Sequence, residues 1–334
     1  MPTNISYAGT DSILESLVLH TLPDFGEHGD GIINCNFLLA ALREKKRFRE
    51  VEGGLEFWKG LIKQENTNFK WQSHTDTMNA NLQDPVERLR FAIKTFTGSI
   101  VINKLHEAQN KGRAMVKNFA QTLRDQAEST IPNNFNSAFW NTSPGALEPE
   151  SVPSLISITP TTGTIGGLSR VGRLELQNGV STTAFQMGAQ AGVQAIKNIQ
   201  IRQAVTANDM IDIFIMTDTL YAGLVGYLST LNRYRPDERM AKLDFDTINL
   251  GNTLVSFENT NVKGGANTLT AGYVYGINSK HFLFEVLKDG NFIWNPEGFE
   301  RVPLTLNKAL YFWVFCNLTT NLPRAHFVAT GVTA

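Results

Sequence analysis

Residues 89–131 read LRFAIKTFTGSIVINKLHEAQNKGRAMVKNFAQTLRDQAESTI, and this stretch decides the fold. Its first part predicts a strand, because apolar side chains alternate with polar or small ones from Leu89 to Lys94 and β-branched and aromatic residues continue from Phe96 to Ile102. From residue 104 the apolar residues recur at the three- and four-residue steps of a helix. The sequence thus predicts a long strand followed at once by a long helix.

The helical half of the stretch predicts an amphipathic helix over 104–131. Asn103 is a favourable N-cap, and apolar residues recur from Leu105 to Ala127 with charged residues on the opposite face. About 27 residues span roughly 40 Å, whereas the average helix of a globular protein has about 11–12 residues. We expect the helix to end before Pro132, because the residue preceding a proline is pushed out of the α region. Such a helix is typical of a structural beam.

Upstream of this helix, residues 51–103 predict one extended β-hairpin. Two strand-like runs flank a long polar stretch that carries Phe69 and Trp71. A lone two-stranded hairpin is at best marginally stable in water, so we expect it to lie on another surface. We expect Trp58, Phe69 and Trp71 to contact an adjacent subunit, because aromatic residues carry much of the energy of interfaces. The alternative is that the hairpin tip folds back on its own subunit.

The rest of the chain predicts an arm before the hairpin and a mixed region after the helix. Residues 1–50 contain candidate short helices near 13–21 and 35–46, and neither can bury its apolar stripe alone. Residues 141–180 are rich in Pro, Gly, Ser and Thr and mark a boundary. Beyond it we expect helices over 181–198 and 220–228 and strands over 211–216, 253–257, 271–277, 282–287, 299–304, 310–317 and 325–330. The predicted fold class is therefore α+β.

Composition argues against several classes of protein. The 334 residues carry a net charge of −1, so the basic excess of a dedicated nucleic-acid binder is missing. The low share of charged residues, 18%, suits a protein that lies in contact with copies of itself. Cys35 and Cys316 have no metal-binding or redox spacing, and the sequence contains neither a signal-peptide pattern nor an apolar run of membrane length. We expect a protein made and used in a cytoplasm.

Residues that could carry catalysis form no recognisable motif. The six histidines lack zinc-binding spacings, and the Gly-rich stretch 161–167 lacks the GK[ST] ending of a P-loop, so it predicts a flexible loop. Two carboxylate pairs, Asp209 with Asp212 and Asp244 with Asp246, predict solvated turns. We assign no catalytic, cofactor-binding or metal-ligating residue, and we expect the chain not to be an enzyme.

The order of these parts resembles that of the tailed-bacteriophage major capsid proteins with the HK97-type fold. An arm, a long hairpin, a spine helix and a mixed domain with late long strands follow one another in that family. Several local stretches are similar to segments of the same family, and they occur in the family's order: 91–102, 110–112, 166–170, 212–217, 275–280 and 322–332. The resemblance covers about residues 50–332.

The resemblance implies a domain division and a function. It implies an N-terminal arm (1–50), an extended loop (51–103), a peripheral domain (104–150 and 281–318) built on the spine helix, and an axial domain (151–280 and 319–334). Such subunits form hexamers and pentamers that close into an icosahedral phage head around double-stranded DNA, which they contact weakly and non-specifically. The resemblance also implies portal and possible decoration proteins as partners, no membrane, and assembly of the virion in the cytoplasm of a bacterial host. Because only about 50 residues precede the hairpin, we expect a separate scaffolding protein.

Two other functions and one mechanistic point stay open at this stage. An encapsulin-type shell around enzyme cargo would have the same fold, and a soluble α+β enzyme without a known motif is the alternative from another class. Gly112 lies inside the predicted helix, where glycine costs about 1 kcal/mol relative to alanine. We expect it to let the spine helix bend in an immature shell, the alternative being close packing against a neighbouring strand.

Overall fold

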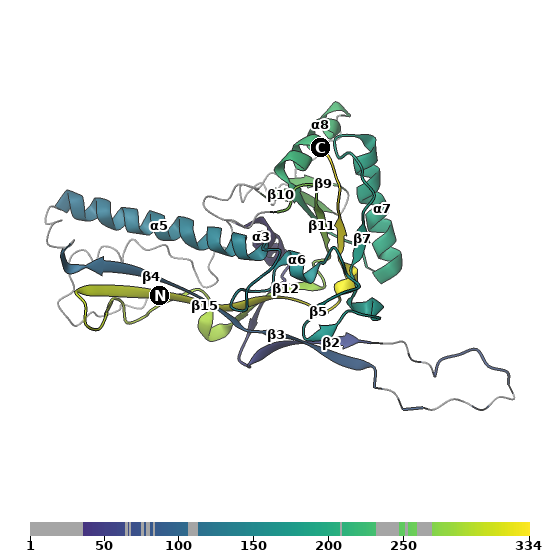
Figure 1. Cartoon of the computed structure of the whole chain (residues 1–334), viewed down its shortest axis with the longest axis horizontal. Helices are drawn as coiled ribbons and strands as arrows, with labels where there is room; N and C mark the ends of the chain where they lie inside the picture. Colours follow the sequence, from purple (N-terminus) through teal and green to yellow (C-terminus); the bar gives the residue numbers. More distant parts are fainter. Residues whose placement is uncertain are drawn as a thin grey trace.

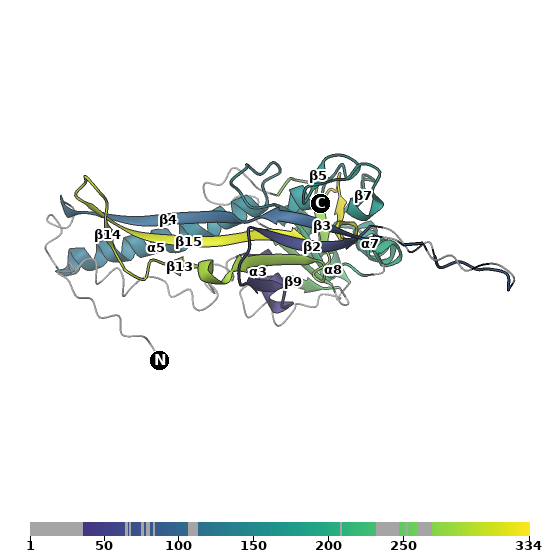
Figure 2. The same cartoon turned by 90° about the horizontal axis from the view of Figure 1, so that it is seen from below.

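The computed structural model describes residues 36–63, 66, 68–74, 77, 81–82, 84–105, 113–207, 209–231, 247–250, 253–258 and 269–334. They form three parts (Figure 1): a long sheet with a helix along it, a second sheet that rises beside one end of the first, and a two-stranded hairpin that projects from their junction. Seen from below, the long sheet and the hairpin extend in opposite directions from this junction (Figure 2).

The first sheet is organised around one long strand. Its order is β1-β12-β15-β13, and β4 and β14 also pair with β15. Strand β15 pairs antiparallel with β4 along the whole of β4, from Asn307 opposite Asn103 to Cys316 opposite Lys94. The strands of this sheet are β1 (Phe48–Val51), β4 (Lys94–Asn103), β12 (Phe282–Leu287), β13 (Ile293–Trp294), β14 (Glu300–Arg301) and β15 (Asn307–Thr320).

This pairing corrects the hairpin predicted over 51–103. The two strands that pair with each other are β2 (Glu56–Ile62) and β3 (Val86–Ala92), whereas β4 belongs to the first sheet. The physical reason lies in Ile100 and Ile102 of β4, which are buried. A free hairpin has no apolar layer to cover such side chains, but the first sheet supplies one.

Helix α5 (Arg113–Phe139) continues past Pro132, which corrects the predicted end at residue 131. A proline inside a helix removes one hydrogen bond and crowds the preceding turn, at a cost of about 3 kcal/mol. The helix continues because Ile131, Phe135 and Phe139 are buried along it, and each such side chain contributes about 1.5–3 kcal/mol. Phe135 also packs on Phe96 of β4, with ring centroids 4.9 Å apart.

The second sheet has the order β7-β16-β11-β8-β10-β9 and packs against two helices (Figure 1). The helix predicted to start at residue 181 begins nine residues later, because Val180 and its neighbours pair with β16 as a strand instead. The elements of this part are β7 (Gly179–Ser181), α7 (Gln190–Ala207), β8 (Ile213–Thr217), α8 (Asp218–Thr230), β9 (Thr247–Asn249), β10 (Leu254–Glu258), β11 (Val274–Ile277) and β16 (Phe327–Ala329).

Short elements connect these parts. The helix expected over 35–46 is α3 (Phe37–Glu44), whereas the helix expected near 13–21 lies outside the described residues. The remaining short elements are α6 (Val152–Leu155), β5 (Thr164–Ile165), β6 (Leu168–Ser169) and the single 3₁₀ turns η2 (Leu174–Leu176), η3 (Lys288–Gly290) and η4 (Pro323–Ala325).

A relay of three side chains joins α3, α5 and β10. Asn36 caps α3 by accepting a hydrogen bond from the backbone N–H of Leu39, and its amide donates to Asn136 of α5 over 2.7 Å. The Asn136 amide in turn donates to Oε1 of Glu258, at the end of β10, over 2.9 Å. Glu258 is buried, and burial raises the pKa of its carboxyl to about 7, although the Asn136 hydrogen bond opposes the shift. An ionisable group thus sits at the junction of the spine helix and the second sheet.

We expect the Glu258→Gln variant to be more stable than the wild type at pH 8 but not at pH 4.5. The raised pKa means that the folded chain holds a proton that the unfolded chain has lost, so this group costs stability as pH rises from about 4.5 to about 7. The full difference amounts to about 3 kcal/mol. Thermal melting of both proteins at pH 4.5 and pH 8 measures it. The exposed Glu297→Gln variant is the control, and an equal gap at the two pH values would contradict the expectation.

Candidate inter-subunit surface

The hairpin formed by β2 and β3 has one buried face and one exposed face. Phe57, Lys59 and Leu61 of β2 point inward and are buried, as are Leu89 and Phe91 of β3. The residues between them face solvent, as the two-residue period of a strand requires. The projecting hairpin therefore rests on the body by its inner face and offers its outer face to other molecules.

The outer face carries an exposed tryptophan between two arginines. Trp58 is 55% exposed, and the guanidinium carbons of Arg88 and Arg90 lie 5.1 and 5.8 Å from the centroid of its ring. The indole N–H donates a hydrogen bond to Glu56 over 3.2 Å. Both cation–π distances are within the range of an attractive interaction, so the indole is held in place while its surface stays accessible. Tryptophan and arginine are the residue types most enriched among the strongest contributors to protein interfaces.

Residues 68–74 of the connection between β2 and β3 lie beyond the paired strands and away from both sheets (Figure 1). Phe69 and Trp71, which lie in this connection, are almost fully exposed. The structure therefore does not support the alternative in which Phe69 and Trp71 fold back on their own subunit. Ile62 and Val86, the last pair of the hairpin ladder, are exposed as well, so apolar side chains occur along the projection.

A buried ion pair fixes the base of the hairpin to the first sheet. The ammonium group of Lys59 in β2 lies 2.6 Å from Oε1 of Glu285 in β12, and both side chains are buried. Thr319 of β15 donates to the other carboxylate oxygen over 2.9 Å. Burial lowers the pKa of Lys59, and the hydrogen bond and charge of Glu285 oppose that shift. These two residues are 226 positions apart in the sequence, and no local pattern indicated their contact.

A second contact holds β3 against a small hairpin made of β5 and β6. The backbone N–H of Arg90 donates to the carbonyl of Gly166 over 2.9 Å. Gly166 has φ +53°, and a Cβ atom there would lie 2.9 Å from Cβ of Leu89. Both the backbone conformation and the lack of space therefore require glycine at this position. The flexible loop predicted over 161–167 is therefore wrong. The Gly-Gly pair between Ile165 and Leu168 is a hairpin signal, which could have been read from the sequence.

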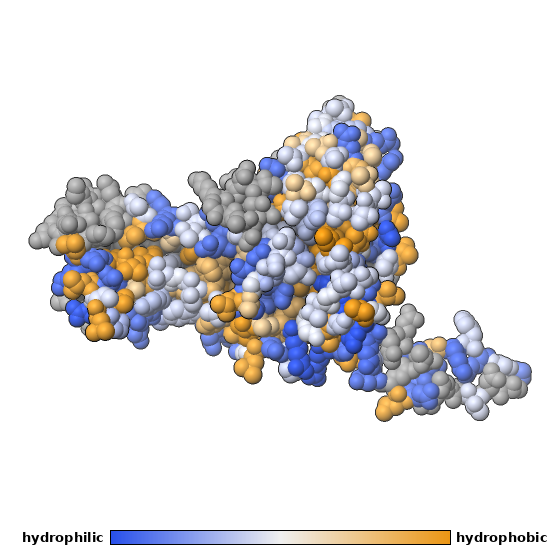
Figure 3. All heavy atoms as spheres, in the orientation of Figure 1, coloured by the Kyte–Doolittle hydropathy of each residue, from blue (hydrophilic) through white to orange (hydrophobic). Residues whose placement is uncertain are grey.

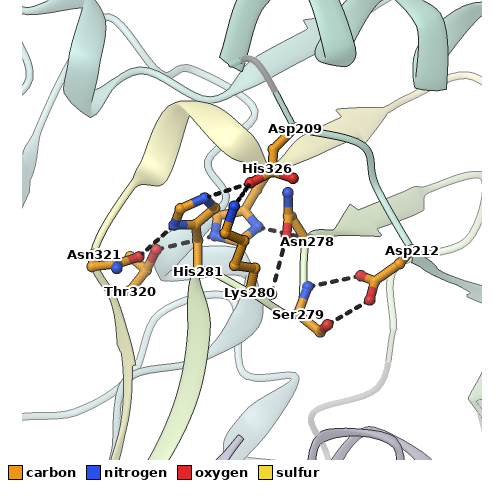
Figure 4. A network of polar contacts seen from close by, with 9 residues as sticks. All are labelled: Asp209, Asp212, Asn278, Ser279, Lys280, His281, Thr320, Asn321 and His326. Carbon is orange, nitrogen blue, oxygen red and sulfur yellow. Dashed lines mark hydrogen bonds and ion pairs between the residues drawn. The ribbon is translucent and has the colours of Figure 1, made fainter. Parts of the chain in front are cut away.

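The densest group of polar side chains lies where the chain crosses between the two sheets (Figure 4). One crossing, 278–281, links β11 to β12, and the other, 321–326, links β15 to β16. Asp209 accepts hydrogen bonds from Lys280 over 2.7 Å and from His281 over 3.2 Å. Burial alone would raise the pKa of Asp209, but the hydrogen bonds of Lys280 and His281 outweigh it and lower the pKa. Asp212 accepts from the backbone N–H and the hydroxyl of Ser279.

A fully buried histidine ties these two crossings together. Nδ1 of His326 accepts from the backbone N–H of Asn278 over 3.2 Å, so Nε2 carries the proton and donates to Thr320 over 3.0 Å. Burial lowers the pKa of His326 to about 3, so the ring is neutral in the folded protein. The hydrogen bonds of this cluster join the two crossings to each other and to Asp209 and Asp212. The described residues contain no group of three or more His, Cys, Asp or Glu side chains that could hold a metal ion.

Of the four residues singled out from the sequence, three lie on the hairpin. Trp58 is on β2, and Phe69 and Trp71 are in the connection that follows it. All three are accessible in the single chain, and contact with another subunit stays a prediction. Gly112 lies outside the described residues. Among the described residues, no helix combines the length and apolar character needed to cross a membrane.

Comparison with known proteins gives matches among solved structures. No family model matches the sequence, and no curated protein is significantly similar to it. The capsid asymmetric unit of cyanophage A-1(L) superposes with a TM-score of 0.62 at 11% identity, covering 86% of this chain and 91% of that one. A gene-transfer-agent (GTA) particle capsid gives 0.52 at 12%, covering 87% and 89%, and the mature capsid of bacteriophage PhiM1 gives 0.50 at 10%, covering 86% and 85%. The similarity is thus one of fold along nearly the whole of each chain.

We expect Lys59→Met to lower the free energy of unfolding by about 3–5 kcal/mol, because the Glu285 carboxylate is then buried without its cation. The double variant Lys59→Met/Glu285→Leu removes both charges and should recover most of that loss. Urea denaturation of the three proteins measures the difference, with the exposed Lys70→Met variant as the control. A double variant no more stable than the single one would show that the ion pair is not what anchors β2.

Proposed function

We propose that this chain, which has the HK97-type capsid fold, is the major capsid protein of a tailed bacteriophage. In this proposal it assembles into hexamers and pentamers of an icosahedral head that encloses double-stranded DNA. The observation that carries the proposal is the hairpin: it is anchored at its base by a buried ion pair, and it holds its aromatic side chains in solvent. Within a fold shared with capsid subunits, such a projection is best explained by contact with a neighbouring copy.

The physical argument rests on exposure. Trp58, Phe69 and Trp71 are large aromatic side chains whose burial would be favourable, yet the single chain leaves them in water. Their burial against a second copy gives one subunit a projection and its neighbour a receiving surface. A contact between two different patches of this kind is heterologous, and it closes into a ring when the rotation between subunits permits. Rings of five and six then require no further type of contact within the capsomer.

The domain division fits the two sheets. We assign the peripheral domain to the first sheet with α5, and the axial domain to the second sheet with α7 and α8. The extended loop is the β2–β3 hairpin with its connection, and the arm comprises the residues before β1. This assignment departs from the division expected from the sequence at β1 and β4, which pair with β12 and β15 and therefore belong to the peripheral domain.

The partners follow from the same role. They are copies of the chain, a separate scaffolding protein, a portal protein and, where the outer surface is decorated, a decoration protein. The net charge of −1 suits a subunit that contacts packaged DNA weakly and without sequence preference. Assembly takes place in the cytoplasm of the bacterial host, and the mature protein is part of the virion.

Electron microscopy of the expressed chain, with and without candidate scaffolding proteins, tests the proposal. Closed shells or capsomers are expected, and shells isolated from infected cells should contain DNA. Nucleic-acid-free shells that contain an enzyme would support an encapsulin-type container instead. A chain that stays monomeric at high concentration in all conditions would overturn the proposal in favour of a soluble protein of another class.

Substitution of the tip aromatics should separate folding from assembly. Because Phe69 and Trp71 make no buried contacts in the single chain, Phe69→Ser/Trp71→Ser should leave the melting temperature unchanged. It should reduce shell yield by at least about tenfold, the effect of losing roughly 1.4 kcal/mol of contact energy. Lys70→Ser, between the two aromatics, is the matched control. Emission of Trp71 should shift to shorter wavelength on assembly, and fluorescence typical of solvent in assembled shells would contradict the role of this residue.

Gly112→Ala addresses the proposed bending of the spine helix. Alanine favours a straight helix by about 1 kcal/mol at an interior position, so the variant should hinder assembly or maturation. Shell yield and the rate of expansion of immature shells measure the effect, with Ala114→Gly as the reverse substitution nearby. Unchanged yield and expansion rate would remove bending at this position from the mechanism.

A further inference from the structure

The turn over residues 302–306, here called the end turn, presents leucines to solvent at the far end of the first sheet. Leu304 is fully exposed, and Leu306 and Leu105 beside it are mostly exposed. The end turn connects β14 to β15 where β4 also ends, at the left of the molecule in Figure 1. Figure 3 shows apolar surface at this end of the molecule. Burial within the single chain does not account for these side chains.

The backbone of the end turn adopts a conformation that leucine rarely takes. The N–H of Thr305 donates to the carbonyl of Val302 over 3.2 Å, with Pro303 second and Leu304 third in the turn. Leu304 has φ +62°, the left-handed conformation that a type II turn requires at its third position and that glycine adopts most easily. A leucine there is both strained and exposed, and such outliers concentrate at functional sites.

The end turn is also held firmly in place. The carbonyl of Leu306 accepts from the backbone N–H of Lys104 over 3.1 Å, and the amide of Asn103 donates to Asn307 over 2.7 Å. These contacts join the turn to the end of β4. Leu304 is therefore a fixed projection, which lowers the entropy lost when it enters a partner.

A groove of matching character runs between α5 and the first sheet of the same chain. Its volume is about 300 Å³, enough for a leucine side chain with room to spare. Figure 3 shows apolar surface in the corresponding region below α5. The groove is lined mainly by apolar side chains, among them Phe96, Ile100, Leu123, Ala127, Trp294 and Phe312.

A glycine in β4 keeps this groove open. Gly98 lies opposite Phe312 in the β4–β15 ladder and lines the groove. A Cβ atom built on Gly98 would meet no atom within 4 Å, so packing inside the chain does not require glycine there. Glycine in the interior of a strand weakens the strand, and it often marks a place that another molecule approaches closely.

The end turn of the same chain cannot fill this groove. Along β4, Gly98 lies five residues from Asn103, which is opposite the first residue of β15, and five residues of strand span about 17 Å. Leu304 lies beyond that end and is fully exposed, so it does not reach back. Among the described residues, the end turn of a second copy carries an exposed side chain of the right kind to occupy the groove.

We propose that the end turn of one copy inserts Leu304 into the groove over Gly98 of a second copy. The inference rests on the proposed function and adds a contact to the hairpin contact described above. Because each copy carries both patches, a copy can give its leucine to one neighbour and receive one from another, and such a heterologous contact closes into a ring when the rotation between copies permits.

Disulfide trapping tests the geometry directly. Leu304→Cys and Gly98→Cys are made in a Cys35→Ser background, purified separately, and mixed during assembly under mild oxidation. The native Cys316 is buried and does not compete. A disulfide-linked dimer that contains one of each variant is expected. Assembly without this dimer, at any ratio of the two proteins, would overturn the inference.

Substitutions on each side of the contact test its contribution. Leu304→Gly removes the projecting side chain and relieves the left-handed backbone, while Gly98→Leu fills the groove. Each should lower shell yield by at least about tenfold without lowering the melting temperature, as expected for loss of an interface contact. Leu147→Gly, at another exposed leucine, is the matched control and should assemble normally.

The outcomes keep the two proposals separate. Wild-type shells together with equally abundant shells from Leu304→Gly and Gly98→Leu would overturn this contact and leave the capsid function standing. A wild-type chain that forms neither shells nor the mixed disulfide would overturn both. Shells that are lost in both variants and kept in the control support both.

Discussion

The backbone pairing between β4 and β15 is the constraint on which the rest of the structure depends. Strand β15 is long enough to pair with β4 along one edge and with β12 along the other, and β13 and β14 also pair with it. A sheet with a strand of this length gives α5 a continuous apolar surface, to which Phe135 and Phe139 attach the helix. The hairpin is then fixed through β12, which carries Glu285, and through β3, which enters β4 after a break at Ile93. Loss of the β4–β15 ladder would therefore release the helix and the hairpin together.

Where the chain crosses between the sheets, residues of one crossing hydrogen-bond to residues of the other. His326 and Asn278 belong to different crossings, and so do His281 and Asn321, which contact each other over 2.8 Å. A buried neutral histidine suits this position, because it offers one donor and one acceptor without the cost of burying a charge. The cluster contains two histidines and two aspartates. The hydrogen bonds of the two histidines serve to connect the two crossings.

Local sequence patterns predicted individual strands and helices, but they did not predict which elements pair with each other. The strand-like runs on either side of the polar stretch in 51–103 predicted strands, and the three- and four-residue steps from Leu105 predicted a helix, because those signals depend on which face of one element is buried. The partner of β4 lies about 200 residues away, and the contact of Lys59 with Glu285 spans 226 positions, so neither was visible in a window of sequence. The helix end predicted before Pro132 was wrong because the burial of three large side chains outweighed the local tendency of proline to end a helix. The expected strand over 299–304 shrank to β14 because Pro303 and Leu304 form a turn. Of the candidate interface residues, the aromatic ones were recognised by type and context. Leu304 was missed because its special feature is a backbone angle.

The anchoring of the hairpin bears on the proposed shell, in which the same subunit forms both pentamers and hexamers. The paired strands β2 and β3 rest on the body by their inner face, whereas Phe69 and Trp71 lie beyond them in solvent, so a small change of angle where the paired strands end moves Trp71 by a larger distance. In the shell that we propose, the same sequence would then reach its neighbour across the two different angles of pentamers and hexamers, without any change in either sheet. In the proposed shell, a rigid body together with one connection that changes its angle would let the subunit fit regions of different curvature.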